Sequence, residues 1–208
     1  MLVYSGTPLS NFEAGQNYKD VSDPAVVVSF PLLSDPDTHL LAWTTTPWTL
    51  PSNLALCVNP KFEYVKIVDK TRQNKVFIIL EKRLVQLFPE IAKPECTDER
   101  KAELFEVKEK LLGEKLVGLK YSPIFPYFAS HENAFVVISD GYVTDENGTG
   151  IVHQAPAFGE DDYRVCINFG IVKKGEELPC PVDANGRFTQ EVPDFAGLNV
   201  RKICCHPS

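Results

Sequence analysis

Residues 43–53, WTTTPWTLPSN, carry the chain from the end of one predicted strand into a sharp turn. Pro47 has no backbone donor and holds Thr46 in an extended or turn conformation, so a regular strand ends there. Short β-branched and aromatic runs of strand length recur on both sides of this stretch. They are Ala25 to Phe30, His39 to Thr44, Leu54 to Val58, Phe62 to Val68, Val76 to Leu80, Phe135 to Ser139 and Thr149 to His153.

Turn signals separate several of these runs. The pairs Asp140-Gly141, Asn147-Gly148 and Asn185-Gly186 are typical of tight hairpins, in which glycine or asparagine supplies a positive φ. Such turns favour antiparallel pairing of consecutive strands. We therefore predict a mainly β fold of the α+β class, with an antiparallel, barrel-like core and a few peripheral helices.

Two segments are predicted to be helical. Glu81 to Leu87 offers about two turns. Glu160 to Phe169 is the stronger case, because Gly159 can start a helix and three acidic residues fill the first turn, where the helix dipole favours them. The charged stretch Cys96 to Lys110 follows two prolines, and its composition leaves helix, strand and surface loop open.

The size and charge of the chain restrict its possible functions. With 208 residues, 44% of them hydrophobic, the chain is predicted to form a single domain over residues 1–208. Lys and Arg number 21 against 28 Asp and Glu, and the net charge of -7 argues against broad, sequence-blind binding of nucleic acid. The end of the chain, Arg201 to Ser208, stops without a closing element, so we expect a domain excised from a larger protein.

Targeting, membrane and metal signals are missing from the sequence. No run approaches the roughly 20 apolar residues of a membrane span, and no secretory pattern follows Met1, which predicts a soluble, cytoplasmic protein. The cysteines are irregularly spaced and form no C-x-x-C pair, so we expect free thiols, no disulfide, no metal and no cofactor. They are Cys57, Cys96, Cys166, Cys180, Cys204 and Cys205.

The threonine triplet suggests a water-binding site. Because alternate side chains of a strand share one face, Thr44 and Thr46 are expected to point the same way while Thr45 points elsewhere. Two hydroxyls on one face can orient a water beside a substrate carbonyl. A structural interpretation stays open, since threonine is a favoured strand residue. Trp43 and Trp48, the only tryptophans, are expected either to wall a pocket or to pack in the core.

The second motif, residues 148–156 (GTGIVHQAP), places a single histidine on a predicted strand ahead of an acidic helix start. His153 is either a structural residue or part of a site. Asp161 and Asp162 lie in the predicted first turn, where carboxylates are favoured without any functional purpose. Alternatively, one of them faces a cavity and pairs with a ligand ammonium. Spacing alone does not decide which of the two does so.

Two segments, Trp43 to Asn53 and Gly148 to Tyr163, resemble the signature segments of the editing domain inserted in isoleucyl-tRNA synthetases, called connective polypeptide one. Gly118 to Phe125 and Pro181 to Gly186 also resemble segments of this family, so the similarity covers most of the chain. Related valyl and leucyl editing domains typically place an arginine after the threonine pair, whereas this chain continues Thr46-Pro47-Trp48.

The resemblance is greatest to eukaryotic cytosolic enzymes, as judged from Gln154 and from Arg164-Val165-Cys166. It implies post-transfer editing, that is, hydrolysis of the ester bond of valyl-tRNA(Ile) with exclusion of the larger isoleucyl-tRNA(Ile). A missing methylene gives a synthetic site only about 1–3 kcal/mol of discrimination, which is why a second, hydrolytic site is needed. The implied partners are the 3′ end of the misacylated tRNA(Ile) and the remainder of the synthetase, with the isolated domain a monomer.

The resemblance also implies roles for individual residues. Asp162 is expected to bind the α-ammonium of the misattached amino acid, and Thr44 and Thr46 to line the cleft and position the attacking water. His153 is expected to border the side-chain pocket and collide with the extra carbon of isoleucine. A role for His153 as general base is the rival possibility, which predicts a rate that falls near the imidazole pKa of about 6.5.

Further substrate contacts are implied for Trp43, Thr45, Thr49 and Asn53. The sequence contains neither H-I-G-H nor K-M-S-K-S, the signatures of class I synthetic sites, so aminoacylation is not expected of this chain. Two alternatives remain. One is the editing domain of a related valyl- or leucyl-tRNA synthetase, and the other is a non-catalytic barrel that binds a small molecule or a protein.

Overall fold

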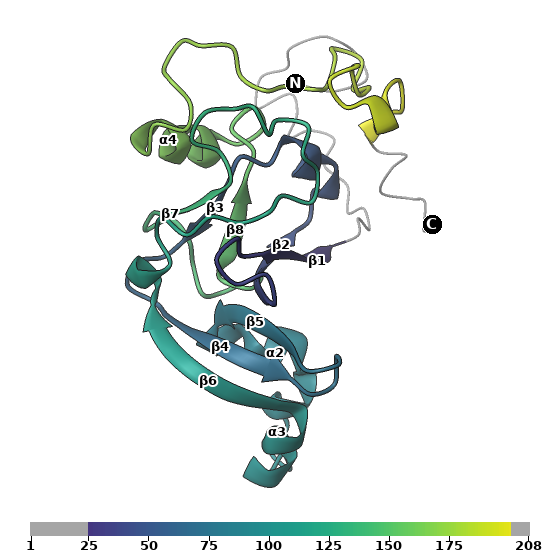
Figure 1. The fold of residues 1–208 in the computed structure, drawn as a ribbon. Coiled ribbons are helices and arrows are strands. Elements are labelled where there is room, and N and C mark those ends of the chain that lie inside the picture. The colour runs from purple at the N-terminus through teal and green to yellow at the C-terminus, as the bar shows by residue number, and fades with distance from the viewer. Residues whose placement is uncertain (1–24, 201–208) are drawn as a thin grey trace, which may run out of the picture.

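The computed structural model describes residues 25–200, in which strands dominate and form two sheets (Figure 1). The five-stranded sheet has the order β1-β2-β5-β4-β6, and the three-stranded sheet has the order β7-β3-β8. The strands are β1 (Val26–Pro31), β2 (Thr38–Thr44), β3 (Ala55–Val58), β4 (Glu63–Asp69), β5 (Lys75–Leu80), β6 (Phe105–Leu112), β7 (Val136–Ser139) and β8 (Ile151–Gln154). The α-helices are α2 (Leu84–Leu87), α3 (Asp98–Leu104) and α4 (Glu160–Asn168). The 3-10 helices are η1 (Pro47–Ser52), η2 (Glu81–Arg83), η3 (Pro89–Ala92), η4 (Gly113–Lys115) and η5 (Pro193–Phe195).

The predicted fold class is confirmed, but the predicted barrel is wrong. All seven predicted strands are present, and both predicted helical segments are helical. However, β1 and β6 are the two edges of the larger sheet, and within residues 25–200 no barrel closes. The strands therefore bury their apolar faces by packing two open sheets and the helices together.

Strand order explains why the hairpin expectation was only partly correct. The consecutive pairs β1-β2 and β4-β5 are antiparallel, as expected. In contrast, β2 pairs with β5 and β3 pairs with β7 in parallel. Because β3 lies between β7 and β8, Asn147-Gly148 does not join two paired strands. Gly148 still has a positive φ of 69° and lies in a longer connection that returns the chain to β8.

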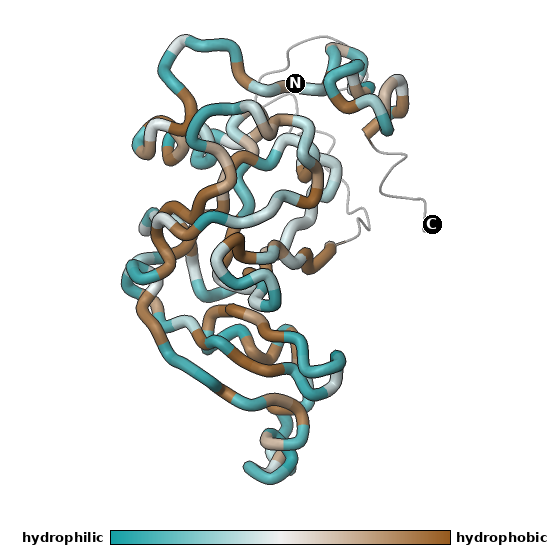
Figure 2. The backbone as a smooth tube through the Cα atoms, in the orientation of Figure 1, coloured by the Kyte–Doolittle hydropathy of each residue, from teal (hydrophilic) through white to brown (hydrophobic). Residues whose placement is uncertain are grey.

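The undecided charged stretch forms α3 followed by β6. Thr97 begins the helix, and its hydroxyl accepts a hydrogen bond from the backbone N–H of Arg100 at 3.2 Å. The strand β6 pairs with β4 and is mostly exposed. Lys110 on β6 forms an ion pair with Glu81 at 2.5 Å. Backbone pairing and charge pairs thus support an edge strand in which Phe105 and Leu111 pack against the core and the residues between them are mostly hydrophilic (Figure 2).

The hydrophobic core has three main parts. One fills the space around β2, β3, β5 and β8, and includes Leu40, Leu56, Leu80 and Ile151. A second lies between α4 and the smaller sheet, and a third between β4-β5 and the helices α2 and α3. These parts bring β8 against β2, so the first and second sequence motifs meet in space.

A smaller cluster, built from Phe188, Val192 and Val200, packs against Trp48 on η1. No helix in residues 25–200 has the length and apolar character needed to cross a membrane. Cys57, Cys96, Cys166 and Cys180 are free thiols. The predictions for the end segment 201–208, including Cys204 and Cys205, fall outside the described residues.

Candidate functional site

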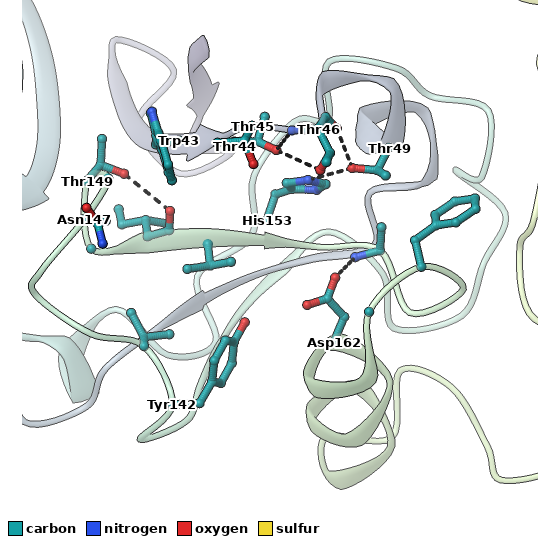
Figure 3. A pocket seen from close by; sticks show the side chains of 18 of the residues that line it. Trp43, Thr44, Thr45, Thr46, Thr49, Tyr142, Asn147, Thr149, His153 and Asp162 are labelled. Carbon is teal, nitrogen blue, oxygen red and sulfur yellow. Dashed lines mark hydrogen bonds between the residues drawn. The ribbon is translucent and has the colours of Figure 1, made fainter. Parts of the chain in front are cut away.

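A cavity of about 440 Å³ lies where the end of β2, the edge of β8 and the start of α4 meet (Figure 3). Its volume is in the range usual for small-molecule sites. The lining comes from both sequence motifs and from the connection before β8. It comprises Trp43, Thr44, Thr45, Thr46, Trp48, Thr49, Tyr142, Val143, Thr144, Asn147, Gly148, Thr149, Gly150, Ile151, Val152, His153, Ala155, Phe158, Gly159 and Asp162.

The hydroxyls of Thr44 and Thr46 lie together as predicted, whereas Thr45, which was expected to point elsewhere, lines the same cavity. Thr44 is the last residue of β2, and its Oγ1 accepts the backbone N–H of Thr46 at 3.0 Å. The hydroxyl oxygens of Thr44 and Thr46 lie 3.3 Å apart, while Thr45 has no hydrogen bond to either. Pro47 then starts η1 and turns the chain away. Two adjacent hydroxyls at the cavity wall provide donors and acceptors for a water.

A buried hydrogen-bond chain links the first motif to the second. The Thr49 hydroxyl donates to the Thr46 carbonyl at 2.8 Å and lies 3.0 Å from Nε2 of His153. Since Thr49 has only one hydroxyl proton, its oxygen accepts the Nε2–H of the imidazole. This arrangement favours the neutral tautomer of His153 that carries its proton on Nε2. Its Nδ1 is buried and has no hydrogen-bond partner among the described residues.

Burial lowers the pKa of His153 to about 4, because the imidazolium loses its hydration inside the protein. With this lowered pKa, the imidazole is neutral and is a weak base at physiological pH. The observed environment therefore favours a steric role for His153 over the general-base role. A fall in rate at the ordinary imidazole pKa is not expected.

The same burial predicts an acid-dependent loss of stability. Between pH 6.5 and pH 4, the unfolded chain protonates His153 and the folded chain does not, so lowering the pH favours unfolding. This group alone should reduce the free energy of unfolding by about 2 kcal/mol at pH 5 relative to pH 7. Urea unfolding at both pH values measures the loss. In His153→Gln, the loss of unfolding free energy between pH 7 and pH 5 should be smaller by about this amount. The control His131→Gln should show the same loss as the wild type. Equal losses in the two variants would contradict the attribution to His153.

Asp162, not Asp161, faces the cavity. The Oδ2 atom of Asp162 accepts the backbone N–H of Ala155 at 2.9 Å, which directs the carboxylate toward β8 (Figure 3). Asp161 is exposed and forms an ion pair with Arg164 at 2.8 Å, and Arg164 also pairs with Asp140 at 2.8 Å. The arginine thus holds Asp161 away from the cavity. Of the two carboxylates, Asp162 is the one that lines the cavity.

The carboxylate of Asp162 is only partly compensated by the protein. Burial raises its pKa, and the hydrogen bond from Ala155 opposes that rise. Within residues 25–200, no Lys, Arg or His forms an ion pair with Asp162. A half-buried anion without a protein cation, at the wall of a cavity, is suited to bind a ligand cation.

Both tryptophans line the cavity. The ring of Trp48 lies 5.0 Å from that of Phe158 in an edge-to-face contact, and it is supported from behind by the cluster near Phe188. Trp43 packs on Gly148, where a Cβ atom would lie only 3.0 Å from the indole ring. Both tryptophans therefore serve as wall residues, and Trp48 also packs against a buried cluster.

The expected substrate contact by Asn53 is not supported by its position. Asn53 is buried outside the cavity lining. Its amide nitrogen donates to the carbonyl of Ala55 at 2.9 Å, and its amide oxygen accepts the hydroxyl of Tyr121 at 2.6 Å. Both polar ends of the side chain are satisfied inside the protein. Asn53 thus fixes the connection from η1 to β3, and Trp43, Thr45 and Thr49 remain the further wall residues.

Sequence reasoning missed several lining residues on the connection before β8 and on the turn before α4. Tyr142 is the most notable, because its hydroxyl accepts the amide N–H of Gln154 at 2.6 Å at the edge of the cavity. Asn147 and Phe158 are the others with large side chains. Tyr142 and Phe158 were not predictable as site residues, since aromatic residues usually pack in cores. No group of three or more potential metal ligands exists within the described part of the chain.

Comparisons with known proteins identify relatives of the chain. It is 56% identical over 197 residues to "Isoleucine--tRNA ligase, cytoplasmic" of Saccharomyces cerevisiae, and 54% identical over 198 residues to the enzyme of the same name from Mus musculus. Each alignment covers 94% of this chain but only 17% and 15% of the respective relative. The chain thus spans about one sixth of these relatives. No protein-family model matches it.

Solved structures with the same fold are editing domains of another synthetase. The crystal structure of GlLeuRS-CP1 matches with a TM-score of 0.54 at 19% identity, covering 87% of this chain and 76% of that one. The leucyl-tRNA synthetase editing domain of P. knowlesi matches with a TM-score of 0.52 at 19% identity, covering 67% of this chain and 59% of that one. At this identity the structures establish the fold alone, whereas the sequence relatives establish descent. The chain therefore belongs to the isoleucine–tRNA ligase family, as a segment with the fold of an editing domain.

Proposed function

We propose that this chain performs post-transfer editing by hydrolysing the ester bond of valyl-tRNA(Ile) while excluding isoleucyl-tRNA(Ile) by size. The observation that carries the proposal is the single cavity that contains Thr44, Thr46, His153 and Asp162. These side chains come from both motifs, more than 100 residues apart, and the fold gathers them at one place. Cytoplasmic isoleucine–tRNA ligases are its relatives, which also favours a cytoplasmic location and the remainder of a synthetase as partner.

In this proposal the substrate is oriented by charge and shape. The ammonium of the valyl group pairs with Asp162, which is half-buried and lacks a protein cation. The valine side chain lies against Thr49 and His153, whose mutual hydrogen bond holds the imidazole in a fixed position. Because burial keeps His153 neutral, it presents bulk without a competing positive charge near the ammonium.

No covalent nucleophile is required. An aminoacyl ester is already activated, so holding a water next to its carbonyl and stabilising the developing charge can suffice. The Thr44 oxygen already accepts the Thr46 N–H, so its hydroxyl proton is available to the Thr46 oxygen or to a water in the cavity. The threonine pair is therefore assigned to water positioning, with the 3′ terminal adenosine of the RNA as the main nucleic-acid contact.

A deacylation assay tests the proposal. The chain is incubated with valyl- and isoleucyl-tRNA(Ile), each carrying labelled amino acid, and the released label is counted over time. High protein concentration is needed, because the acidic net charge of -7 predicts weak RNA affinity. We expect release of valine and little release of isoleucine. A folded sample that is inert toward both would refute the proposal, and cleavage of threonyl-tRNA(Val) alone would indicate editing for a different synthetase.

A further inference from the structure

Gly159, the residue before α4, lies unusually close to the carboxylate of Asp162. A Cβ atom built on Gly159 would be 2.8 Å from Cγ, 3.0 Å from Oδ2 and 3.1 Å from Oδ1 of Asp162. The first of these distances is shorter than side chains tolerate, so one of the two groups would have to move. The backbone of Gly159 has φ -133° and ψ 135°, an ordinary extended conformation open to any residue. The need for glycine here is therefore one of space, not of backbone freedom.

The carboxylate occupies this space because of where its hydrogen bond leads. Asp162 is the third residue of α4, a position from which a carboxylate commonly turns back to the residue that begins the helix. Here it passes over Gly159 and accepts the N–H of Ala155, at the end of β8. The turn in between is fixed by a bond from the Phe158 N–H to the Ala155 carbonyl at 2.9 Å. Gly159 thus lies beneath a side chain that bridges the helix start and the strand end.

From this geometry we infer that Gly159 is a positioning residue for the editing reaction: its missing side chain lets the Asp162 carboxylate reach Ala155 and face the substrate ammonium. The inference rests on the proposed function, since it assigns Asp162 to the ammonium. A Cβ at position 159 displaces the carboxylate from the Ala155 N–H and rotates it away from the cavity. The nearby Asp161 does not replace it, because Arg164 holds that carboxylate on the surface.

Gly159→Ser separates a positioning role from a structural one. Serine is a favoured residue at a helix start, so this substitution should maintain or raise the melting temperature while its Cβ displaces Asp162. Gly159→Ala is the second variant, and an extended φ is compatible with alanine. Gly141→Ala is the matched control, because a Cβ there meets no atom within 4 Å and Gly141 has no positive φ.

The probes are a non-hydrolysable valyl-adenosine analogue and the matching isovaleryl analogue, which lacks only the α-amine. The wild-type chain and Gly141→Ala should bind the valyl probe at least tenfold more tightly than the isovaleryl probe. In both Gly159 variants this preference should fall at least tenfold, and Gly159→Ser combined with Asp162→Asn should bind as Asp162→Asn alone does. Wild-type preference retained in the folded Gly159 variants would overturn the inference alone. A wild-type chain without any preference would overturn the proposed function, and the inference with it.

Discussion

Asp162→Asn is expected to reduce kcat/KM for valyl-tRNA(Ile) by 30- to 1000-fold. The asparagine keeps the size of the side chain and loses its charge, so the substrate ammonium would face a neutral amide. Charge-assisted hydrogen bonds at partly desolvated sites contribute about 2–4 kcal/mol, which corresponds to this range of rate. Initial rates of valine release at several substrate concentrations provide the measurement.

Asp161→Asn is the matched control. Asp161 is the neighbouring residue of the same helix turn, but it is exposed and paired with Arg164. Exposed ion pairs contribute at most about 1 kcal/mol, so this variant should retain activity close to that of the wild type. Equal losses of activity in the two variants would mean that the total negative charge of the helix turn matters, and not Asp162 in particular. An inactive Asp161→Asn with an active Asp162→Asn would mean that Asp161 binds the ammonium.

His153→Ala is expected to make isoleucyl-tRNA(Ile) a substrate. Removing the imidazole opens the wall beside Thr49, where the extra carbon of isoleucine would otherwise collide. A single methylene in an apolar pocket is worth about 1–3 kcal/mol, so the ratio of valine to isoleucine release should fall by about 10- to 100-fold. Parallel assays with both charged tRNAs measure this ratio.

His153→Gln distinguishes bulk from base chemistry. Glutamine keeps most of the volume and a donor for the Thr49 hydroxyl, but it has no group that takes up a proton in the physiological range. If His153 acts by its size, this variant should still hydrolyse valyl-tRNA(Ile) and still spare isoleucyl-tRNA(Ile). Loss of valine release in a folded His153→Gln chain would instead restore the general-base hypothesis.

Local sequence patterns predicted the strands but not how the strands associate. The run Val76 to Leu80 has strand composition wherever it pairs, so β5 was predictable. That it pairs with β2 in parallel depends on the whole core, which no local turn signal encodes. The edge strand β6 could not be predicted because its composition is mostly charged, and its conformation is fixed by pairing with β4. Tertiary pairing, not propensity, determined these features.

The candidate site was predictable to the extent that its motifs are contiguous. The spacing of Thr44 and Thr46 predicts that their hydroxyls lie together, as they do, although Thr46 lies in the turn after β2. Asn53 belongs to the same motif, yet its side chain turns inward to Tyr121, a partner 68 residues away. Tyr142, in contrast, lies outside both motifs, and the packing around β8 brings it to the cavity wall. Long-range packing therefore decides which motif residues reach the substrate.

A crystal structure of the chain with the non-hydrolysable valyl-adenosine analogue tests the central claim most directly. We expect the α-ammonium within hydrogen-bonding distance of the Asp162 carboxylate, the valine methyl groups against Thr49 and His153, and the carbonyl carbon beside the hydroxyls of Thr44 and Thr46. An analogue bound elsewhere, or bound in this cavity with its ammonium directed away from Asp162, would contradict the account.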